Sequence, residues 1–228
     1  MTSSLDLYAK IEPLIGFYDE YEELYSSYLQ ILLSLHVESV LDIGCGNGKF
    51  LKLLKDNSFD AFGIDRSQEM IKIAKKLGVN VQAKELLDFK ESSFESAVAI
   101  GDVLNYMRDD ELDPFFSQVR RVVGKDGYFL ADINTEVGFE VADGAMIKDT
   151  EEKFLSIEAS YEDKVLTTNI TLFEKIDESY KKSSGQVFQY FHPKSRFENL
   201  QDFRLVASSP ISMFSDEDEK LLMLFQAI

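Results

Sequence analysis

The sequence predicts an α/β fold built on a doubly wound, mainly parallel sheet, with helices before it and a strand-rich segment inserted late in the chain. From residue 37 to 133, short apolar runs alternate with helical patterns, an order that places strands side by side in a parallel sheet. Residues 134–192 instead alternate apolar and polar side chains, which is typical of half-exposed antiparallel strands. The 228 residues, 45% of them hydrophobic, suit one domain with a sizeable core.

The composition favours a small-molecule partner. The formal net charge is −17 and the pI is about 4.5, so the chain repels the phosphates of nucleic acids and of anionic membranes. No opening run resembles a signal peptide, and no apolar stretch approaches the length that spans a membrane. The single cysteine has no second thiol with which to form an intramolecular disulfide. We expect a cytoplasmic protein that binds neither nucleic acid nor membrane.

Residues 1–36 are expected to form two helices with a break near Pro13 and Gly16. The tyrosines of this region recur at helical spacing: Tyr8, Tyr18, Tyr21, Tyr25 and Tyr28. They form either the half-polar face of core helices or a lid whose hydroxyls contact a ligand.

A strand, a glycine turn and a helix start are predicted at residues 40–50, Val-Leu-Asp-Ile-Gly-Cys-Gly-Asn-Gly-Lys-Phe. Gly44, Gly46 and Gly48 remove side chains where the chain turns sharply, so a ligand can approach the backbone closely. The helix that follows directs free N–H groups at that ligand, and Asp42 offers a carboxylate at the end of the strand. Cys45 is either a catalytic thiol or simply a small residue between two glycines; no histidine lies nearby in sequence to activate it.

The strands that follow bring further polar residues to the same edge of the sheet. Asp65 ends the second strand, 61–65, about 20 residues after the first glycine, where an acid binds ribose hydroxyls. Ser67 caps the helix 69–77. The third and fourth strands are 79–83 and 96–100, and a helix at 111–123 leads to the fifth strand, 128–133. After the fourth strand, the residues that either cap a helix or line a pocket are Asp102, Asn105 and Tyr106.

These motifs, in this order over residues 38–133, resemble the class I S-adenosylmethionine (SAM) methyltransferases. The resemblance implies a Rossmann-like sheet of seven strands with an antiparallel last strand, SAM as cofactor and S-adenosylhomocysteine as product. Glu85 stands where the family usually has Asp, which leaves open whether its side chain contacts the adenine. The residues that the resemblance assigns to the cofactor are Asp42, Gly44, Cys45, Gly46, Gly48, Asp65, Arg66, Glu85, Leu86, Gly101 and Asp102.

The segment 134–192 is expected to be a strand-rich insertion between the fifth and sixth strands. Its predicted strands and turns are 154–161, a turn at 162–164, 165–173, a turn at 183–185, and 186–191. In the family such an insertion covers the acceptor site or pairs two subunits, so we expect a homodimer through residues 154–191. The ending Phe191–His192 resembles, distantly, the amino-sugar N-methyltransferases. The core then resumes with a short helix at 194–201, a strand at 205–213, an acidic loop at 215–219 and a last strand at 220–228.

The predicted function is SAM-dependent transfer of a methyl group to an amine or hydroxyl of a small polar molecule, by one domain with a helical lid at 1–36. His192 and Asp102 are the candidates for a base, and the expected acceptor contacts are Tyr18, Tyr21, Tyr106 and His192. No metal is expected, since the acidic loop lacks a coordination pattern. Two alternatives stay open: a SAM-binding protein without transfer activity, and a nucleotide-binding oxidoreductase. Lys49, which stands where the nicotinamide fingerprint needs a glycine, counts against the second.

Overall fold

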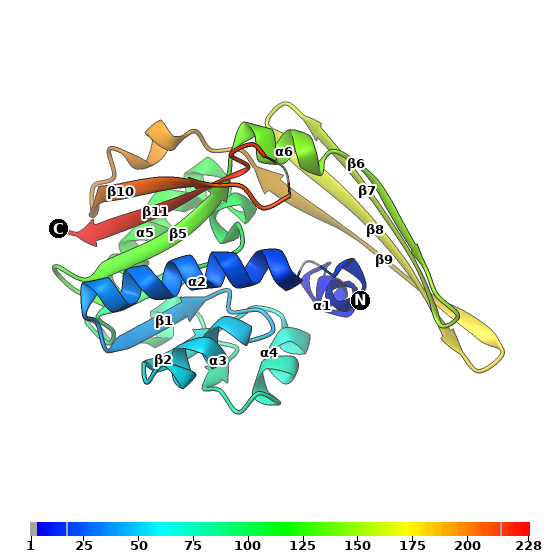
Figure 1. Cartoon of the computed structure of the whole chain (residues 1–228), viewed down its shortest axis with the longest axis horizontal. Helices are drawn as coiled ribbons and strands as arrows, with labels where there is room; N and C mark the ends of the chain where they lie inside the picture. Colours follow the sequence, from blue (N-terminus) through cyan, green and yellow to red (C-terminus); the bar gives the residue numbers. More distant parts are fainter. Residues whose placement is uncertain (1–3, 17, 215) are drawn as a thin grey trace.

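A computed structural model describes residues 4–16, 18–214 and 216–228, without the side chains of residues 4, 5 and 18–20. A core built on one sheet, sheet A, carries a second, curved sheet, sheet B, as an arm on one side (Figure 1). The seven strands of sheet A in this part of the chain are β1 Ser39–Ile43, β2 Asp60–Ile64, β3 Val81–Gln82, β4 Ser96–Ala99, β5 Tyr128–Asn134, β10 Phe203–Ile211 and β11 Lys220–Ala227.

Sheet A has the strand order β10-β11-β5-β4-β1-β2-β3. The five strands from β3 to β5 are parallel, whereas β11 runs antiparallel to both β5 and β10. The predicted doubly wound sheet with an antiparallel last strand is therefore confirmed. The direction of winding reverses between β1 and β4, and open α/β sheets bind their ligands beside the carboxyl ends of strands at such a point.

Helices cover both faces of sheet A. Along each strand the side chains alternate, so that Val40 and Leu130 pack against α2 and α3, while Leu41 and Phe129 pack against α5. The helices are α1 Ser4–Ile15, α2 Tyr18–Leu35, α3 Lys49–Asp56, α4 Gln68–Lys75, α5 Asp109–Val123 and α6 Glu136–Ala142, with 3₁₀ turns η1 Leu86–Asp88, η2 Val103–Tyr106 and η3 Lys194–Phe197. Among the helices described, none is both long and apolar enough to cross a membrane.

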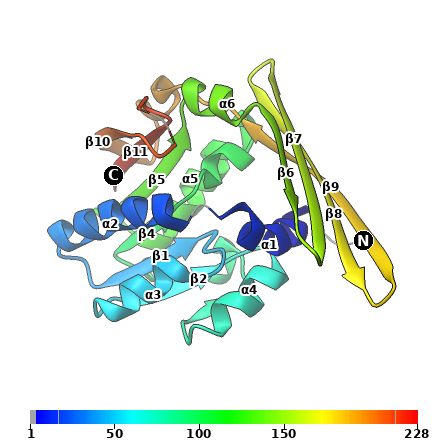
Figure 2. The same ribbon diagram turned by 45° about the vertical axis from the view of Figure 1, so that its right-hand side comes forward.

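Sheet B consists of β6 Gly144–Asp149, β7 Lys153–Glu162, β8 Val165–Ile176 and β9 Ser179–Tyr190, paired antiparallel in that order. Its inner face holds Leu155, Ile170 and Leu172, which are buried against Leu7 and Ile11 of α1. Figure 2 shows α1 between sheet B and α4, so this helix joins the arm to the core.

The predicted turn at 183–185 is wrong. The chain continues as β9 through these residues, and Gly185 pairs with Ile170 of β8. The hairpin turns instead at residues 177–178, where Asp177 has φ 53°, a left-handed conformation that aspartate tolerates. The Ser-Ser-Gly tract suggested a turn by its composition, but pairing along the whole length of β8 outweighs that local preference.

Other boundaries also differ from the prediction. The strand β6 and the helix α6 were not predicted, although Thr135 gives a cap signal by accepting a hydrogen bond from Gly138 N at 3.2 Å. β3 has two residues rather than five, η1 replaces a helix between β3 and β4, and the helix predicted at 194–201 is the single turn η3. The break between α1 and α2 follows Ile15, so Pro13 lies inside α1.

The buried contact between α1 and sheet B predicts a large effect of Leu155→Ala on stability. The side chain is fully buried, so its truncation should lower the free energy of unfolding by about 2–5 kcal/mol, through lost burial and the cavity left behind. Glu158→Ala, on the exposed face of the same strand, is the control and should change it by less than about 0.5 kcal/mol. Urea unfolding of both variants measures the difference; equal effects would contradict the assigned packing.

Candidate functional site

The glycine turn after β1 is fastened to the end of β2. Gly44 N and Cys45 N both donate to Ile64 O, at 2.8 and 3.0 Å, and Gly46 N donates to Asp65 Oδ2 at 2.9 Å. A Cβ added at Gly46 would have nothing within 4 Å, whereas one at Gly48 would lie 2.7 Å from Ala74 Cβ. Gly48 therefore lets α3 pack against α4, and Gly46 leaves backbone open to a ligand.

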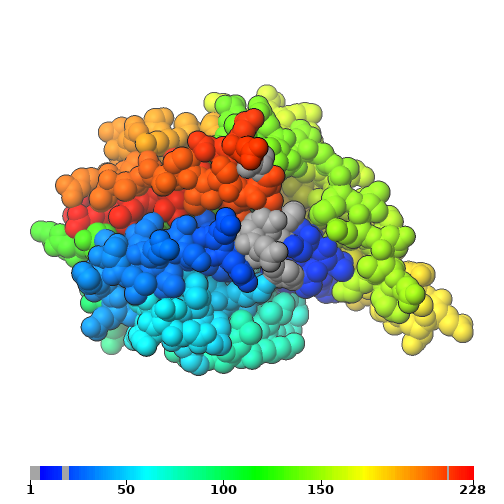
Figure 3. Space-filling view, in the orientation of Figure 1, coloured from blue at the N-terminus to red at the C-terminus, as the bar shows by residue number. Residues whose placement is uncertain are grey.

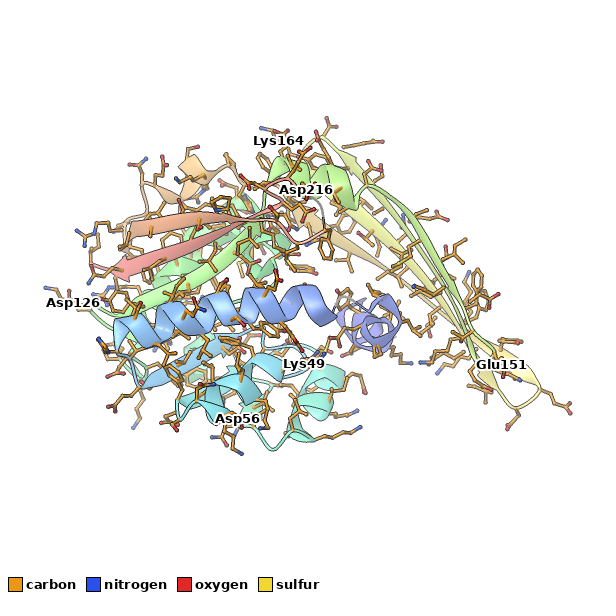
Figure 4. All side chains as sticks on the ribbon, in the orientation of Figure 1. Lys49, Asp56, Asp126, Glu151, Lys164 and Asp216 are labelled. Carbon is orange, nitrogen blue, oxygen red and sulfur yellow. The ribbon has the colours of Figure 1, made fainter. Side chains whose placement is uncertain are left out.

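A cavity of about 150 Å³ lies where the carboxyl ends of β1 and β4 meet, covered by α1 and α2. Lys49, at the start of α3, lies between α2 and α4 (Figure 4). In the space-filling view α1 covers this region between the core and sheet B (Figure 3). The lining residues that the structure describes are Tyr8, Glu12, Ile15, Tyr21, Tyr25, Asp42, Gly44, Cys45, Gly46, Asn47, Lys49, Phe50, Met70, Ile100, Gly101, Asp102 and Tyr106.

The cavity carries more negative than positive charge. Of its described lining residues, Glu12, Asp42 and Asp102 are acidic, and Lys49 is basic. Burial raises the pKa of Asp42 to about 8, with a further contribution from Asp65, and burial also raises the pKa of Glu12. Asp42 Oδ2 is buried and has no hydrogen-bond partner among the described residues. A cation with N–H donors would relieve both the missing bond and the unfavourable charge.

Four residues predicted to hold the ribose and adenine lie beside this cavity rather than in its described lining. Asp65 binds the glycine turn through Oδ2 and accepts from Ser67 N through Oδ1, at 2.7 Å. Arg66 and Glu85 are both exposed, and Arg66 Nε lies 3.6 Å from Glu85 Oε1. This ion pair links the ends of β2 and β3. Leu86 is buried. The four continue the edge of sheet A that begins at the glycine turn, and their cofactor roles stay predictions.

The residues after β4 divide between the two predicted roles. Gly101, Asp102 and Tyr106 line the cavity. Asn105 is fully buried and structural: its Nδ2 donates to Tyr190 O at 2.9 Å, and its Oδ1 accepts from Asn134 N at the same distance. Asp102 precedes η2 without capping it through its side chain. The site therefore receives a carboxylate and a phenol from this loop.

The N-terminal tyrosines were predicted to form either a lid over a ligand or a face of core helices, and both arrangements occur. Tyr8, Tyr21 and Tyr25 line the cavity, as a lid would. Tyr28 is instead fully buried in the core, where its hydroxyl donates to Asp132 Oδ1 at 2.8 Å. The side chain of Tyr18 lies outside the described residues, so its predicted contact with the acceptor stays a prediction.

His192 is not among the described residues that line the cavity. Its side chain is buried, with Nε2 2.9 Å from Met107 O and the ring edge-on to Phe197. Burial lowers the pKa of His192, partly opposed by that backbone contact. These contacts support a structural role, and its assignment as a base or acceptor contact stays a prediction. Burial likewise raises the pKa of the Cys45 thiol, which disfavours the reactive thiolate.

The sequence reasoning missed a buried polar cluster beneath Asp102. Asp132 of β5 and Lys220 of β11 are both buried and lie 3.1 Å apart (Asp132 Oδ2 to Lys220 Nζ). A charged residue within an apolar strand, as in Tyr-Phe-Leu-Ala-Asp-Ile at 128–133, is the signal that could have revealed it, because such residues are buried only with partners. Glu12 of α1 was also missed; it accepts a hydrogen bond from Asn47 Nδ2.

Comparison with known proteins identifies the domain. Residues 40–127 match the family model described as a methyltransferase domain. The chain is 36% identical over 129 residues to an uncharacterized protein of Methanocaldococcus jannaschii, covering 50% of this chain and 49% of that one. It is 27% identical over 144 residues to the putative methyltransferase YqeM of Bacillus subtilis, covering 56% and 57%. The chain spans about half the length of the curated relatives it matches.

Solved structures show the same fold along nearly the whole chain. A SAM-dependent methyltransferase from Clostridium acetobutylicum superposes with a TM-score of 0.76 at 19% identity, over 97% of this chain and 96% of that one. The sugar N-methyltransferase KedS8 from Streptoalloteichus gives 0.71 at 15% identity, over 98% and 93%. DesVI of Streptomyces venezuelae gives 0.71 at 16% identity, over 95% and 97%. Residues 40–127 therefore match a methyltransferase-domain model, the chain has the fold of these SAM-dependent methyltransferases, and the predicted resemblance to that family is confirmed.

The buried carboxylate of Asp42 predicts a pH-dependent gain in stability for Asp42→Asn. The pKa of about 8 in the folded protein exceeds the value of about 3.9 expected after unfolding, so stability from this group is greatest at low pH and is lost as the pH rises toward 8. Asparagine does not titrate, so the melting temperature of the variant should exceed that of the wild type by an amount that grows from pH 5 to pH 8.

Asp60→Asn, at an exposed position on the neighbouring strand, is the control and should give a difference that stays nearly constant over that range. Thermal unfolding of the three proteins without ligand measures the effect. A constant difference for Asp42→Asn as well would show that Asp42 does not carry the raised pKa.

Proposed function

We propose that this protein is a SAM-dependent methyltransferase that acts on an amine or hydroxyl of a small polar molecule. The observation that carries the proposal is the acidic cavity at the reversal point of sheet A, which Asp42 lines with a buried carboxylate whose Oδ2 has no hydrogen-bond partner among the described residues. SAM carries a sulfonium and an ammonium, both of which such a cavity attracts. The diphosphate of a nicotinamide dinucleotide is anionic, and a lining with three acidic side chains and one basic one suits it less well.

The chain's own residues fit the donor. We assign the polar ends of the donor to the open backbone at Gly46 and the carboxylates of Asp42 and Asp65, and Tyr8 and Tyr21 line the same cavity. SAM supplies a methyl group on positively charged sulfur, so the protein needs mainly to align the acceptor and exclude water. Because α1 and α2 cover the cavity, they help to exclude water from it.

Three observations support a small acceptor. The net charge of −17 disfavours nucleic acid, and the cavity is narrow and covered by α1. One structural neighbour, KedS8, is described as a sugar N-methyltransferase, although at 15% identity the likeness extends to the fold alone. A SAM-binding protein without transfer activity remains the alternative, because the same cavity would hold the donor in either case. A cytoplasmic location stays a prediction.

The direct test combines donor binding with transfer. Calorimetry should show SAM and S-adenosylhomocysteine binding to the wild type, and Asp65→Ala should weaken both by at least about 1.5 kcal/mol, the lower end for a hydrogen bond to a charged group. Asp60→Ala is the matched control and should bind normally. A screen of amine and hydroxyl metabolites with labelled SAM should then identify a methylated product.

The possible results separate the rival functions. Donor binding without transfer to any acceptor would favour the alternative that acts through a partner. Transfer only to protein or RNA would overturn the small-molecule assignment. Tight binding of NAD(H) with no affinity for SAM would overturn the methyltransferase itself.

We also propose a homodimer through sheet B. Its outer face exposes large apolar side chains on both edge strands, Ile147 on β6 and Phe188 and Tyr180 on β9, and burying them against a second copy would favour self-association. Light scattering should give twice the 26.0 kDa mass of the chain, and Phe188→Asp should shift the population toward that single mass. Leu87→Asp, at an exposed position outside sheet B, is the control and should leave the mass unchanged. A single-chain mass at all working concentrations would contradict the dimer.

A further inference from the structure

The first residue of β11, Lys220, is buried beneath the cavity wall. Its exposed fraction is 4%, and its Nζ pairs closely with Asp102 Oδ1 and lies 3.1 Å from Asp132 Oδ2. Lys220 shares the α2-facing side of sheet A with Leu222, and Leu222 pairs with Asp132 in the strand register. The amine of Lys220 is thus held between two carboxylates, one on β5 and one on the loop that lines the cavity. Burial lowers the pKa of Lys220 to about 7, and the two facing carboxylates favour its protonated form.

Asp132 holds the backbone of that loop. Its Oδ1 accepts from Tyr28 hydroxyl and from Gly101 N, both at 2.8 Å, and its Oδ2 accepts from Asp102 N at 3.1 Å. Asp102 has φ 63°, a left-handed conformation that few residues other than glycine, asparagine and aspartate adopt. The bonds to Asp132 stabilise this conformation, which sets the direction of the Asp102 side chain.

The second oxygen of Asp102 is held from sheet B. Gln189 Nε2, on the inner face of β9, donates to Asp102 Oδ2 at 3.2 Å. Both oxygens of the carboxylate are therefore engaged, one by the core and one by the arm, while the side chain keeps 16% of its surface exposed. Asp102 lines the cavity together with Gly101 and Tyr106. A carboxylate so placed presents a fixed negative charge to whatever enters beside the donor.

We propose that Asp102 binds the nitrogen of an amine acceptor, and that Lys220 and Gln189 are the positioning residues that hold its carboxylate for this purpose. The inference rests on the proposed function and narrows its acceptor to an amine. In the transfer, the nitrogen lone pair forms the new N–C bond, the electrons of the S–C bond remain on sulfur, and the extra proton leaves the nitrogen for water. Positive charge therefore moves from sulfur to nitrogen, and a carboxylate aimed at the nitrogen stabilises that charge as it develops.

The ammonium of Lys220 is what lets Asp102 keep its charge. The titratable groups around this cluster are Asp132 on β5, Tyr28 and Tyr21 on α2, and Lys220 on β11. Without Lys220, two carboxylates would face each other in a buried site, and one of them would take up a proton. Asp102 would then lose its charge or turn away from the cavity. The hydrogen bond from Gln189 Nε2 to Asp102 Oδ2 opposes such a turn.

Sinefungin provides a test that needs no identified acceptor. In this donor analogue a carbon bearing an ammonium replaces the sulfonium, so a cation lies where the methyl group would be, next to the acceptor nitrogen. The wild type should bind sinefungin about tenfold more tightly than S-adenosylhomocysteine, and Asp102→Asn should remove that preference, which is the size expected for one charge-assisted hydrogen bond. Calorimetry measures both affinities.

If Lys220 and Gln189 position Asp102, Lys220→Met should lose the preference for sinefungin as Asp102→Asn does, and Gln189→Leu should reduce it severalfold. Both variants should keep their affinity for S-adenosylhomocysteine. Lys220→Arg keeps the positive charge in a larger side chain, so it should retain more of the preference than Lys220→Met, a result that a defect of packing alone would not produce. Lys75→Met and Gln186→Leu, both exposed, are the matched controls and should behave as the wild type.

Several outcomes would overturn the proposal. An unchanged preference in Asp102→Asn would remove Asp102 from the nitrogen site, and an unchanged preference in Lys220→Met and Gln189→Leu would remove the positioning roles. If Lys220→Met does not fold, Gln189→Leu, at the edge of the cluster, decides the question alone. A wild type that binds neither sinefungin nor S-adenosylhomocysteine would instead overturn the proposed function, so the two failures are distinguishable.

Discussion

Burying carboxylates at the carboxyl edge of sheet A is the constraint on which the rest of this structure depends. Asp42, Asp102 and Asp132 all leave water there, and a buried carboxylate is unfavourable unless hydrogen bonds or an opposite charge compensate it. Asp132 and Asp102 obtain that compensation from Tyr28, backbone N–H groups and Lys220. Asp42 keeps an oxygen without a hydrogen-bond partner among the residues that the structure describes. The carboxylates of Asp102 and Asp132 are therefore compensated within the protein, whereas that of Asp42 is left for a ligand to compensate.

The helix α1 connects the cavity to sheet B by polar as well as apolar contacts. Asp6 accepts from Ser67 Oγ at 2.7 Å, next to the start of α4, and Glu12 accepts from Asn47 of the glycine turn. Lys10 pairs with Glu174 of β8 at 3.2 Å. A ligand that displaces Glu12 or moves α1 therefore also acts on sheet B. The same helix closes the cavity and carries the arm.

The predicted elements that were right are those with a strong local pattern. The glycine turn, the cap at Ser67 and the strands β1, β2 and β5 each depend on a few consecutive residues, and all lie within a residue or two of the prediction. The turn at 183–185 failed because a composition typical of turns was outweighed by pairing with a neighbouring strand. η1 and η3 are too short to show a helical period in the sequence.

The sequence by itself determined the class of fold and one side of the site, because the strand, the glycines and Asp42 are contiguous and their conformations are local. Tertiary structure decided which distant polar residues share the cavity wall. Asp102, Asp132, Gln189 and Lys220 lie in separate parts of the chain, and the pairing of β5 with β11 together with the packing of sheet B against the core brings them within hydrogen-bond distance. Burial then changes their chemistry, since the cost of an isolated charge depends on what surrounds it in space rather than on its neighbours in sequence.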